Sequence, residues 1–510
     1  MEVVDKECQL PEVPSVVEDA VLIKYLKECI DMTPLPDTTL KELMDNSTQF
    51  PRKFPVQTVK CSSLVEQKHV SKELLEENAN SAYPVLHETA LFLYIHFLEH
   101  KKRHGTCPEN ALYANMGLLD FVQRLLEKRS ATFYAKNDKY LLVNGTQGIS
   151  GWEAVGSENE KSPLLLPCCL SYDEMKLSAL LSISSWSYFI NEGTRDNKGV
   201  PQNKTQSFTI RGIIIGLIGA RLKRVGLMEW QEVLVTKTQN TKENGYGVPP
   251  EVGSSEQSNK QECLYSWRKL WAKFYGIKPH LPLFEDVVKL CKSGNNAAMN
   301  QYKQLNKDRF FDNIAYKKRV TVSIETLLLE AEARAASIGT TAYIHVVGIG
   351  LGVWRASEHQ EKEFLEAFAA CLRRLHSVLQ HVSDINFAWF KEQMCAETWK
   401  GIMESNGTGL GIHIIFSKRP PHSKLSEPED AGKLLVVSYA WDGNALPGNE
   451  FWIGKLSSTG DSAAACSTQV AELHNTHVNK NKISSSNLHI ASAQWGILHV
   501  AEYVLKKLKK

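Results

Sequence analysis

The chain has 510 residues, which is too long for one ordinary hydrophobic core, so we expect two or three folded units. Its 43% hydrophobic and 23% charged residues are typical of a globular protein, and a formal charge of +2 gives no overall attraction to nucleic acid or to a membrane surface. We therefore predict no nucleic-acid partner and no membrane association.

The N-terminal sequence and the cysteines indicate in which cellular compartment the protein is found. The opening MEVVDKECQL carries acidic residues where a secretory signal has a basic and then an apolar region. The longest apolar run, at residues 213–220, is far shorter than the roughly 20 residues that span a bilayer. The eleven cysteines include no CxxC pair, which is typical of reduced thiols. We predict a cytoplasmic protein, with the nucleus as the alternative.

The first third of the chain predicts a small helical module. Residues 1–75 mix proline, aspartate and threonine with short apolar stretches, so we expect a partly irregular segment there. Apolar residues recur at helical spacing over 84–104 and 112–128, which predicts two amphipathic helices within a mostly helical module of residues 76–160. Turn formers between 144 and 160 predict the connection to a larger unit at 165–510.

A histidine series in this module suggests a metal site, which we set aside. His96, His100 and His104 lie four residues apart, and Cys107 follows them. Imidazoles at that spacing can share a zinc ion. However, two ligands from one helix are commoner than three, and a basic helix end also interacts favourably with the helix dipole. We therefore predict no metal and no cofactor.

A polar region precedes the regular part of the sequence. Residues 231–236 predict a strand, and the stretch 237–260, rich in Asn, Gly, Ser and Glu, predicts a long surface loop. Loops of this length are often functional, so the region is a candidate for ligand contacts. The polar cluster FINEGTRDN at 189–197 is a weaker candidate.

After residue 319, strand and helix patterns alternate. The predicted strands cover residues 343–347, 385–390, 411–416 and 434–440. The predicted helices cover residues 323–338, 364–379, 463–473 and 495–508. This alternation predicts an α/β fold with a mainly parallel or mixed sheet flanked by helices. In such sheets, ligands bind beyond the carboxyl ends of the strands.

A glycine-rich loop follows the first of these strands. In GIGLGVW, Gly348, Gly350 and Gly352 alternate between a strand and a helix, so their amides could approach a diphosphate without interference from a Cβ atom. Trp354 could then pack on a ribose or a base. The alternative is a tight turn whose glycines only permit close packing. The spacing also lacks the GxGxxG pattern of a Rossmann dinucleotide site.

An acidic loop follows the strand at 434–440. The segment AWDGNALPGNEFW carries Asp442 and Glu450, and Asp461 begins the next predicted helix. Cleavage of an N-glycosidic bond passes through an oxocarbenium-like state, which carboxylates stabilise while one of them activates water. The alternative makes Asp442 a turn former and Asp461 a helix N-cap.

Together these segments resemble a known family. The strand, GIGLGVW loop, helix, FAWF series and AWDGNALPGNE loop resemble macro-domain and poly(ADP-ribose) glycohydrolase folds, and more closely the MavL-like ADP-ribosyl-ubiquitin hydrolases. The resemblance covers about residue 165 to the end and implies a macro-domain-like fold. In ordinary macro domains the catalytic loop precedes the diphosphate loop. The order here is reversed, which suggests a permuted or diverged version.

The resemblance also implies roles for individual residues. It assigns catalysis to Asp442, Glu450 and Asp461, although Glu450 stands where the family is expected to have aspartate. It assigns the diphosphate to Gly348, Gly350, Leu351, Gly352, Val353 and Trp354, the distal ribose to Asn444 and Asn449, and a further ligand contact to Gly443. It further suggests adenosine contacts from Thr238, Gln239, Asn240 and Tyr246, for which a purely structural polar loop is the alternative.

The expected function is removal of mono-ADP-ribose from a protein side chain by carboxylate-activated water attack at the distal ribose. The resemblance implies arginine as the linked residue and ubiquitin as the modified protein, with ADP-ribose as the product ligand. The paired glutamates of poly(ADP-ribose) glycohydrolases are absent, so polymer cleavage is not expected. One alternative is a reader that binds ADP-ribose without cleaving it, which the Glu450 departure favours. Another is an interaction scaffold with a decayed pocket.

Overall fold

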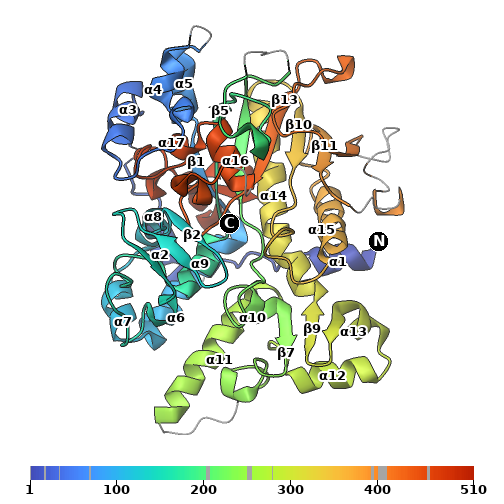
Figure 1. Ribbon diagram of the computed structural model, residues 1–510. Helices are drawn as coiled ribbons and strands as arrows, with labels where there is room; N and C mark the ends of the chain where they lie inside the picture. The colour runs from blue at the N-terminus through green and yellow to red at the C-terminus, as the bar shows by residue number, and fades with distance from the viewer. Residues whose placement is uncertain are drawn as a thin grey trace.

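The computed structural model describes residues 2–16, 19–33, 35–67, 70–202, 207–249, 256–277, 279–391, 396–399, 402, 411–456 and 460–509. Its centre is a nine-stranded sheet with the order β12-β11-β10-β13-β6-β5-β1-β14-β15 (Figure 1). In that order the strands are His413–Ser417, Val382–Ala388, Ala342–Val346, Leu434–Ala440, Arg211–Leu217, Leu181–Tyr188, Tyr83–His87, His489–Ser492 and Gly496–His499. The chain is therefore a mixed α/β protein.

The sheet is parallel on one side and mixed on the other. Strands β12, β11, β10, β13 and β6 are parallel to one another. Strand β5 runs antiparallel to both β6 and β1, whereas β1 is parallel to β14. The sequence prediction of a mainly parallel or mixed sheet is confirmed as a mixed sheet.

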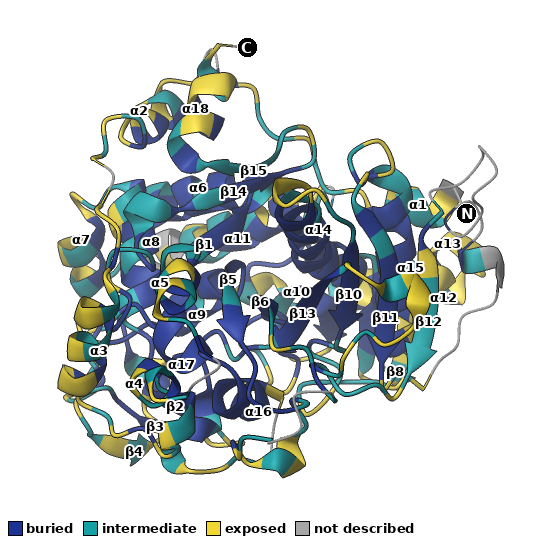
Figure 2. Cartoon of the chain, turned by 90° about the horizontal axis from the view of Figure 1, so that it is seen from above, coloured by how far each residue is buried: buried dark blue, intermediate teal, exposed yellow. Residues whose placement is uncertain are grey.

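Helices cover both faces of the sheet. In β6, Ile213 and Ile215 belong to one hydrophobic cluster and Ile214 to another, because alternate side chains point to opposite faces. One cluster contains the inner faces of α14 (Asn313–Ser337) and α15 (Gln360–Arg374), and the other contains residues of α16 (Gly460–Ser467) and α17 (Val470–Leu473). Figure 2 shows the central strands and α14 in the colour of buried residues. Burial on both faces explains the nearly continuous apolar runs of these strands.

The N-terminal residues are largely helical. Their helices are α1 (Glu2–Cys8), α2 (Ala20–Lys27), α3 (Leu40–Gln49), α4 (Cys61–Val65), α5 (Lys72–Asn80), α6 (Glu88–His104), α7 (Cys107–Tyr113), α8 (Leu118–Glu127) and α9 (Tyr172–Ser178). A small sheet of β2 (Thr132–Tyr134), β3 (Lys139–Leu141) and β4 (Gln147–Ile149) follows α8. Strand β1 of the same region lies in the central sheet, between β5 and β14.

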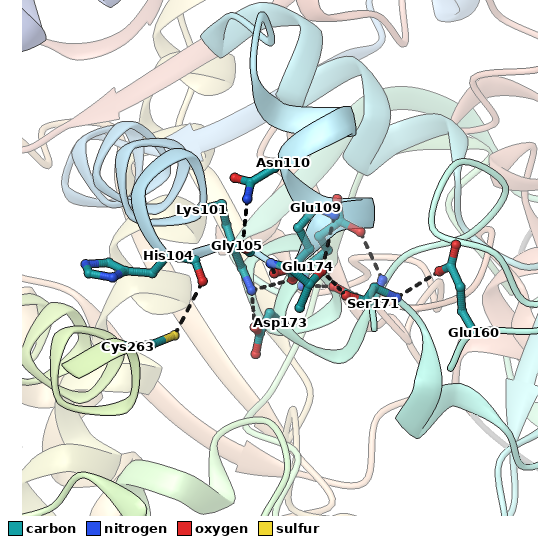
Figure 3. A network of polar contacts seen from close by, with 12 residues as sticks. Lys101, His104, Gly105, Glu109, Asn110, Glu160, Ser171, Asp173, Glu174 and Cys263 are labelled. Carbon is teal, nitrogen blue, oxygen red and sulfur yellow. Dashed lines mark hydrogen bonds and ion pairs between the residues drawn. The ribbon is translucent and has the colours of Figure 1, made fainter. Parts of the chain in front are cut away.

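A buried lysine connects three of these helices. The Lys101 ammonium on α6 contacts Glu109 of α7 at 2.6 Å and Asp173 of α9 at 2.8 Å (Figure 3). Two carboxylates around one buried cation compensate its loss of hydration. The contact joins α6 and α7 to α9, which directly precedes β5 of the central sheet.

A further lobe lies at the bottom of Figure 1, with its own small core of Val235, Phe284, Val287, Tyr302 and Phe310. It comprises α10 (Trp230–Val233), β7 (Leu234–Thr236), α11 (Glu256–Phe274), α12 (Phe284–Lys292), α13 (Asn296–Gln301), β8 (Tyr302–Asn306) and β9 (Arg309–Asp312). The chain ends in α18 (Val500–Leu508). No helix in the described ranges combines the length and apolarity needed to cross a bilayer.

Several predicted elements are wrong in type or extent. The predicted helix at 84–104 begins at Glu88, because residues 83–87 form β1, and the predicted helix at 495–508 contains β15 before α18. Short apolar runs satisfy either periodicity, and sheet pairing decided both cases. The predicted strand at 231–236 starts as α10, and α11 begins inside the predicted loop at 237–260. The predicted helices at 112–128 and 463–473 are each divided into two, and α14 starts ten residues before the predicted helix at 323.

Candidate functional site

Three neighbouring parallel strands deliver their loops to one edge of the sheet. Strands β10, β13 and β6 are adjacent and parallel, so the glycine loop after β10 and the acid loop after β13 leave from the same edge. The backbone N–H of Trp441 donates to the carbonyl of Leu217 at 2.9 Å, which ties the acid loop to the end of β6. The two loops singled out from the sequence therefore lie at a common edge, where ligands bind in α/β sheets.

A cavity of about 600 Å³ opens at this edge. Gly348, Leu351 and Gly352 of the glycine loop line it, as do Ala440 and Gly460, which stand two residues before Asp442 and one residue before Asp461 in the sequence. The three predicted catalytic acids are not themselves among its lining residues. Cavities of roughly 300–1,000 Å³ are the usual size for small ligands, so this one can accommodate a nucleotide sugar.

The glycines of the loop differ in what they do. Gly350 has φ +72°, and its Cβ would lie 3.0 Å from backbone atoms of Ala220, so close packing requires a glycine there. A Cβ on Gly352 would meet nothing within 4 Å, which leaves the loop open toward the cavity at this position. The close-packing interpretation therefore holds for Gly350, whereas diphosphate binding at Gly352 stays a prediction. Helix α15 begins only at Gln360, so the loop does not run directly into a helix N-terminus as the sequence predicts.

The acid loop folds back on itself and gathers three carboxylates. The Gly448 N–H donates to Asp461 Oδ1 at 2.9 Å, and the Asn449 side-chain amide donates to Asp442. Gly448 has φ +99°, and a Cβ there would approach the Ala465 Cβ to 2.7 Å. Glu450 acts electrostatically on both aspartates. The structure therefore brings together the three acids chosen from the sequence.

Burial controls the ionisation of the two aspartates. Loss of hydration raises the pKa of Asp442 to about 7, against the opposing influences of the Arg221 cation and the Asn449 hydrogen bond. Burial, followed by repulsion from Asp442, holds the pKa of Asp461 well above its usual range. Near neutral pH the site thus contains an Asp442 poised between its two forms, beside an Asp461 whose surroundings favour the neutral acid. Such a carboxyl can accept and release a proton during catalysis.

The residues assigned to the distal ribose are packed against the acids. Asn444 is buried, and its side-chain nitrogen has no hydrogen-bond partner among the residues that the structure describes. Asn449 accepts from the Phe133 N–H at 2.9 Å and donates to the Phe133 carbonyl at 3.2 Å, in addition to contacting Asp442. Gly443 packs against Ile218, so a Cβ there would lie 2.8 Å from that side chain. Asn449 therefore orients the acid loop, whereas the Asn444 amide is left for another acceptor.

The residues considered for adenosine contacts lie in a different place. They are Thr238, Gln239, Asn240 and Tyr246. The Gln239 amide donates to the Leu234 carbonyl at 3.0 Å, and the Tyr246 hydroxyl donates to the Gln231 carbonyl at 2.9 Å. All four belong to the described part of the chain, and none lines the cavity. The hydrogen bonds of Gln239 and Tyr246 stabilise the conformation of the loop that carries them.

Other walls of the cavity were missed or ranked low from the sequence. Trp389, which follows β11, lines the cavity with a φ of +66° and remains 62% exposed. Arg195, from the low-ranked cluster at 189–197, also lines it, as does Lys391. A signal for Trp389 was available, because it stands at the carboxyl end of a predicted buried strand. Val353 of the glycine loop points to solvent, with 74% exposure.

The described residues contain no group of three or more His, Cys, Asp or Glu side chains arranged to hold a metal ion. In the histidine series on α6, the His100 ring nitrogen Nδ1 instead lies 3.1 Å from the Ser266 hydroxyl on α11.

Comparison with known proteins places these features in a family. The model of the family described as ADP-ribosylhydrolase MavL-like matches residues 41–506. Two proteins of Drosophila melanogaster are similar over almost their whole length. One, named ADP-ribosylarginine hydrolase CG2909, is 45% identical over 490 residues, covering 95% of this chain and 94% of the relative. The other, named ADP-ribosylarginine hydrolase CG3568, is 43% identical over 494 residues, covering 95% and 92%.

The match includes the central sheet, the glycine loop and the acid loop, and it extends far into the N-terminal residues. The chain therefore belongs to the MavL-like ADP-ribosylhydrolase family.

Proposed function

We propose that this ADP-ribosylhydrolase cleaves the N-glycosyl bond between ADP-ribose and an arginine side chain of a modified protein. The names of its two Drosophila relatives support arginine as the linked residue. The observation that carries the proposal is the group of Asp442, Glu450 and Asp461 at the same edge of the sheet as a cavity that the glycine loop lines. Because the acids and the glycine loop lie at the same edge of the sheet, the acids can act on the distal ribose while the loop binds the diphosphate of the same ADP-ribosyl group.

In the proposed reaction, water attacks the anomeric carbon of the distal ribose. The Asp442 carboxylate accepts a proton from that water, and the bond between carbon and guanidine nitrogen breaks with its electron pair moving to the nitrogen. The nitrogen takes up a proton, so the products are ADP-ribose and unmodified arginine. Asp461 and Glu450 orient the ribose or the water, and the negative charge near the ring stabilises the oxocarbenium-like state.

The proposed binding contacts are divided between the diphosphate, the distal ribose and the adenine. The glycine loop, with Gly352 open to the cavity, is proposed to hold the diphosphate, and the unpartnered Asn444 amide to bind a hydroxyl of the distal ribose. Trp389 offers an exposed aromatic face for the adenine at the far wall. Contacts from the loop at 238–246 stay a prediction, as does ubiquitin as the modified protein.

A release assay with several modified proteins tests this proposal. We expect ADP-ribose release from arginine-modified protein, with arginine-modified ubiquitin as one substrate, and slower release from serine- or carboxylate-linked ADP-ribose. Asp442→Asn should slow release about 100- to 10,000-fold. Asp37→Asn serves as a matched control with wild-type activity, since Asp37 is exposed and pairs with Lys482, outside the site. Equal activity of Asp442→Asn and wild type would contradict the mechanism.

The alternative is a reader that binds ADP-ribose without hydrolysis. The specific observation in its favour is Glu450, which stands where the family resemblance expects aspartate. Calorimetry with ADP-ribose alongside the release assay separates the two functions. Binding without release by the wild-type chain would establish the reader.

A further inference from the structure

The acid loop is clamped by a segment that lies more than 300 residues earlier in the sequence. The Leu446 N–H donates to the Ser130 carbonyl at 2.7 Å, and Asn449 exchanges two hydrogen bonds with the backbone of Phe133. The Arg129 guanidinium lies 4.0 Å from the centroid of the Trp441 ring. Residues 129–133 are thus part of the wall that supports the catalytic acids.

Arg221 extends this clamp to the glycine loop. It follows β6, and its guanidinium lies 5.0 Å from the centre of the Phe133 ring and 5.7 Å from the centre of the Trp354 ring. Next to it, the Leu222 N–H donates to the Trp354 carbonyl at 3.2 Å. Arg221 therefore lies where the small sheet, the acid loop and the glycine loop meet.

The Arg221 charge is anchored at one end only. Its Nη2 pairs with Asp138 Oδ1 at 3.2 Å, while its Nε and Nη1 are buried without a hydrogen-bond partner in the described part of the chain. Asp138, in the turn between β2 and β3, is fully buried and also pairs with Arg224 at 2.9 Å. Arg224 also pairs with Glu153, so two cations and two carboxylates form one network, in which Arg221 is the member that acts on Asp442.

We propose that Arg221, held by Asp138, is a positioning residue that keeps the Asp442 carboxylate in the charged form that accepts a proton from water. This inference rests on the proposed function, in which Asp442 is that acceptor. The small sheet of residues 132–149 then belongs to the catalytic apparatus, because it supplies the anchor of Arg221.

The charges around Asp442 explain why a cation is needed. Burial and Glu450, which lies in the short helical turn Asn449–Ile453, both disfavour a charge on Asp442. Arg221 is the cation that opposes them. On its own side, Arg221 meets the carboxylate of Asp138, and its backbone N–H donates to Glu229 at 3.2 Å. In a poorly hydrated site such a cation acts more strongly than it would in water.

The chain offers a matched pair of variants, since Arg221 and Arg224 both pair with Asp138 but only Arg221 acts on Asp442. The experiment measures the pH profile of kcat/KM for release from arginine-modified protein, with the full-length chain. We expect Arg221→Met to shift the acidic limb of the profile to a higher pH by about one unit. At pH values below the limb kcat/KM should therefore be roughly tenfold lower than in wild type, and at pH values well above the limb it should change little. Arg224→Met should keep the wild-type limb, and Arg221→Lys should keep most of it because the charge is retained.

Each other outcome has a separate meaning. An unshifted limb in Arg221→Met, with activity lowered equally at every pH, would overturn the inference and leave Arg221 a purely structural residue. A limb shifted as far in Arg221→Lys as in Arg221→Met would also overturn it, because the charge would not be the cause. If circular dichroism shows that Arg221→Met is unfolded, Arg221→Gln replaces it, and the same shift of the acidic limb is expected. Absence of release by wild type and Arg224→Met alike would instead contradict the proposed function.

Discussion

Asp442 is a half-buried acid whose surroundings favour function over stability. Burial raises its pKa to about 7, far above the ordinary value of 3.8 for aspartate. A folded-state pKa above the unfolded one means that the native protein prefers the protonated acid. Folding stability is therefore lost as the pH rises from about 4 through about 7, which is the range in which the proposed proton acceptor becomes charged.

This conflict predicts a gain in stability on removal of the acid. Asp442→Asn should raise the melting temperature at pH 8, because it replaces a half-buried charge by a neutral amide of similar shape, and change it little at pH 4. Thermal unfolding at the two pH values measures the difference. A variant that is less stable than wild type at pH 8 would show that the carboxylate is well compensated.

A second prediction at this scale concerns the pH dependence of activity. If Asp442 accepts the proton as a carboxylate, kcat/KM of the wild-type chain should rise with pH through an acidic limb near 7, the pKa that burial gives Asp442. Initial rates of ADP-ribose release between pH 5 and 9 are the measurement. Activity that falls across that range would instead assign the protonated form as the active one.

At the scale of elements, the glycine loop combines a packing function with a proposed binding function. Gly350 is held against Ala220 in a left-handed conformation, whereas Gly352 is open on its Cβ side and lines the cavity. A methyl group added at Gly350 therefore tests the packing of the loop, whereas one added at Gly352 tests ligand binding.

We predict that Gly350→Ala lowers the melting temperature, because the methyl group meets backbone atoms at 3.0 Å. Gly352→Ala should leave the melting temperature within a degree or two and weaken ADP-ribose binding, because the methyl group enters the space proposed for the diphosphate. Thermal unfolding and calorimetry with ADP-ribose test both variants. Unchanged ADP-ribose affinity of Gly352→Ala would remove the loop from the binding site.

The sequence predicted the elements around this site better than those elsewhere. Strand β13 occupies the predicted residues 434–440, and β10 is displaced by one residue, because both are buried apolar runs bounded by turn formers. The grouping of Asp442 with Asp461 also followed from their positions at a strand end and a helix start. Arg221 and Asp138 could not be found, because their contact joins loops 83 residues apart that carry no periodic pattern.

At the scale of the whole molecule, N-terminal residues complete the central sheet. Strand β1 lies between β5 and β14, and the Lys101 contacts connect α6 and α7 to α9. The sequence could not reveal this arrangement, because the pairing of β1 with β14 joins residues about 400 positions apart. The division into units at 76–160 and 165–510 stays a prediction about independent folding.

The sheet order makes that division testable. A chain that starts at residue 165 would lack β1 and leave β5 and β14 without their shared neighbour, with main-chain hydrogen-bonding groups exposed on both. We expect this shortened chain to aggregate or to lack a cooperative unfolding transition, whereas the full-length chain unfolds cooperatively. A soluble, cooperatively unfolding 165–510 fragment would instead establish it as an independent unit.

The central claim is that one cavity holds ADP-ribose while Asp442 performs the chemistry. The most direct test combines two measurements on wild type and Asp442→Asn: ADP-ribose affinity by calorimetry, and single-turnover release from arginine-modified protein. We predict similar affinities and a release rate about 100- to 10,000-fold lower for Asp442→Asn, the range expected for loss of a general base. Release by Asp442→Asn at the wild-type rate, or loss of ADP-ribose binding together with release, would contradict the account.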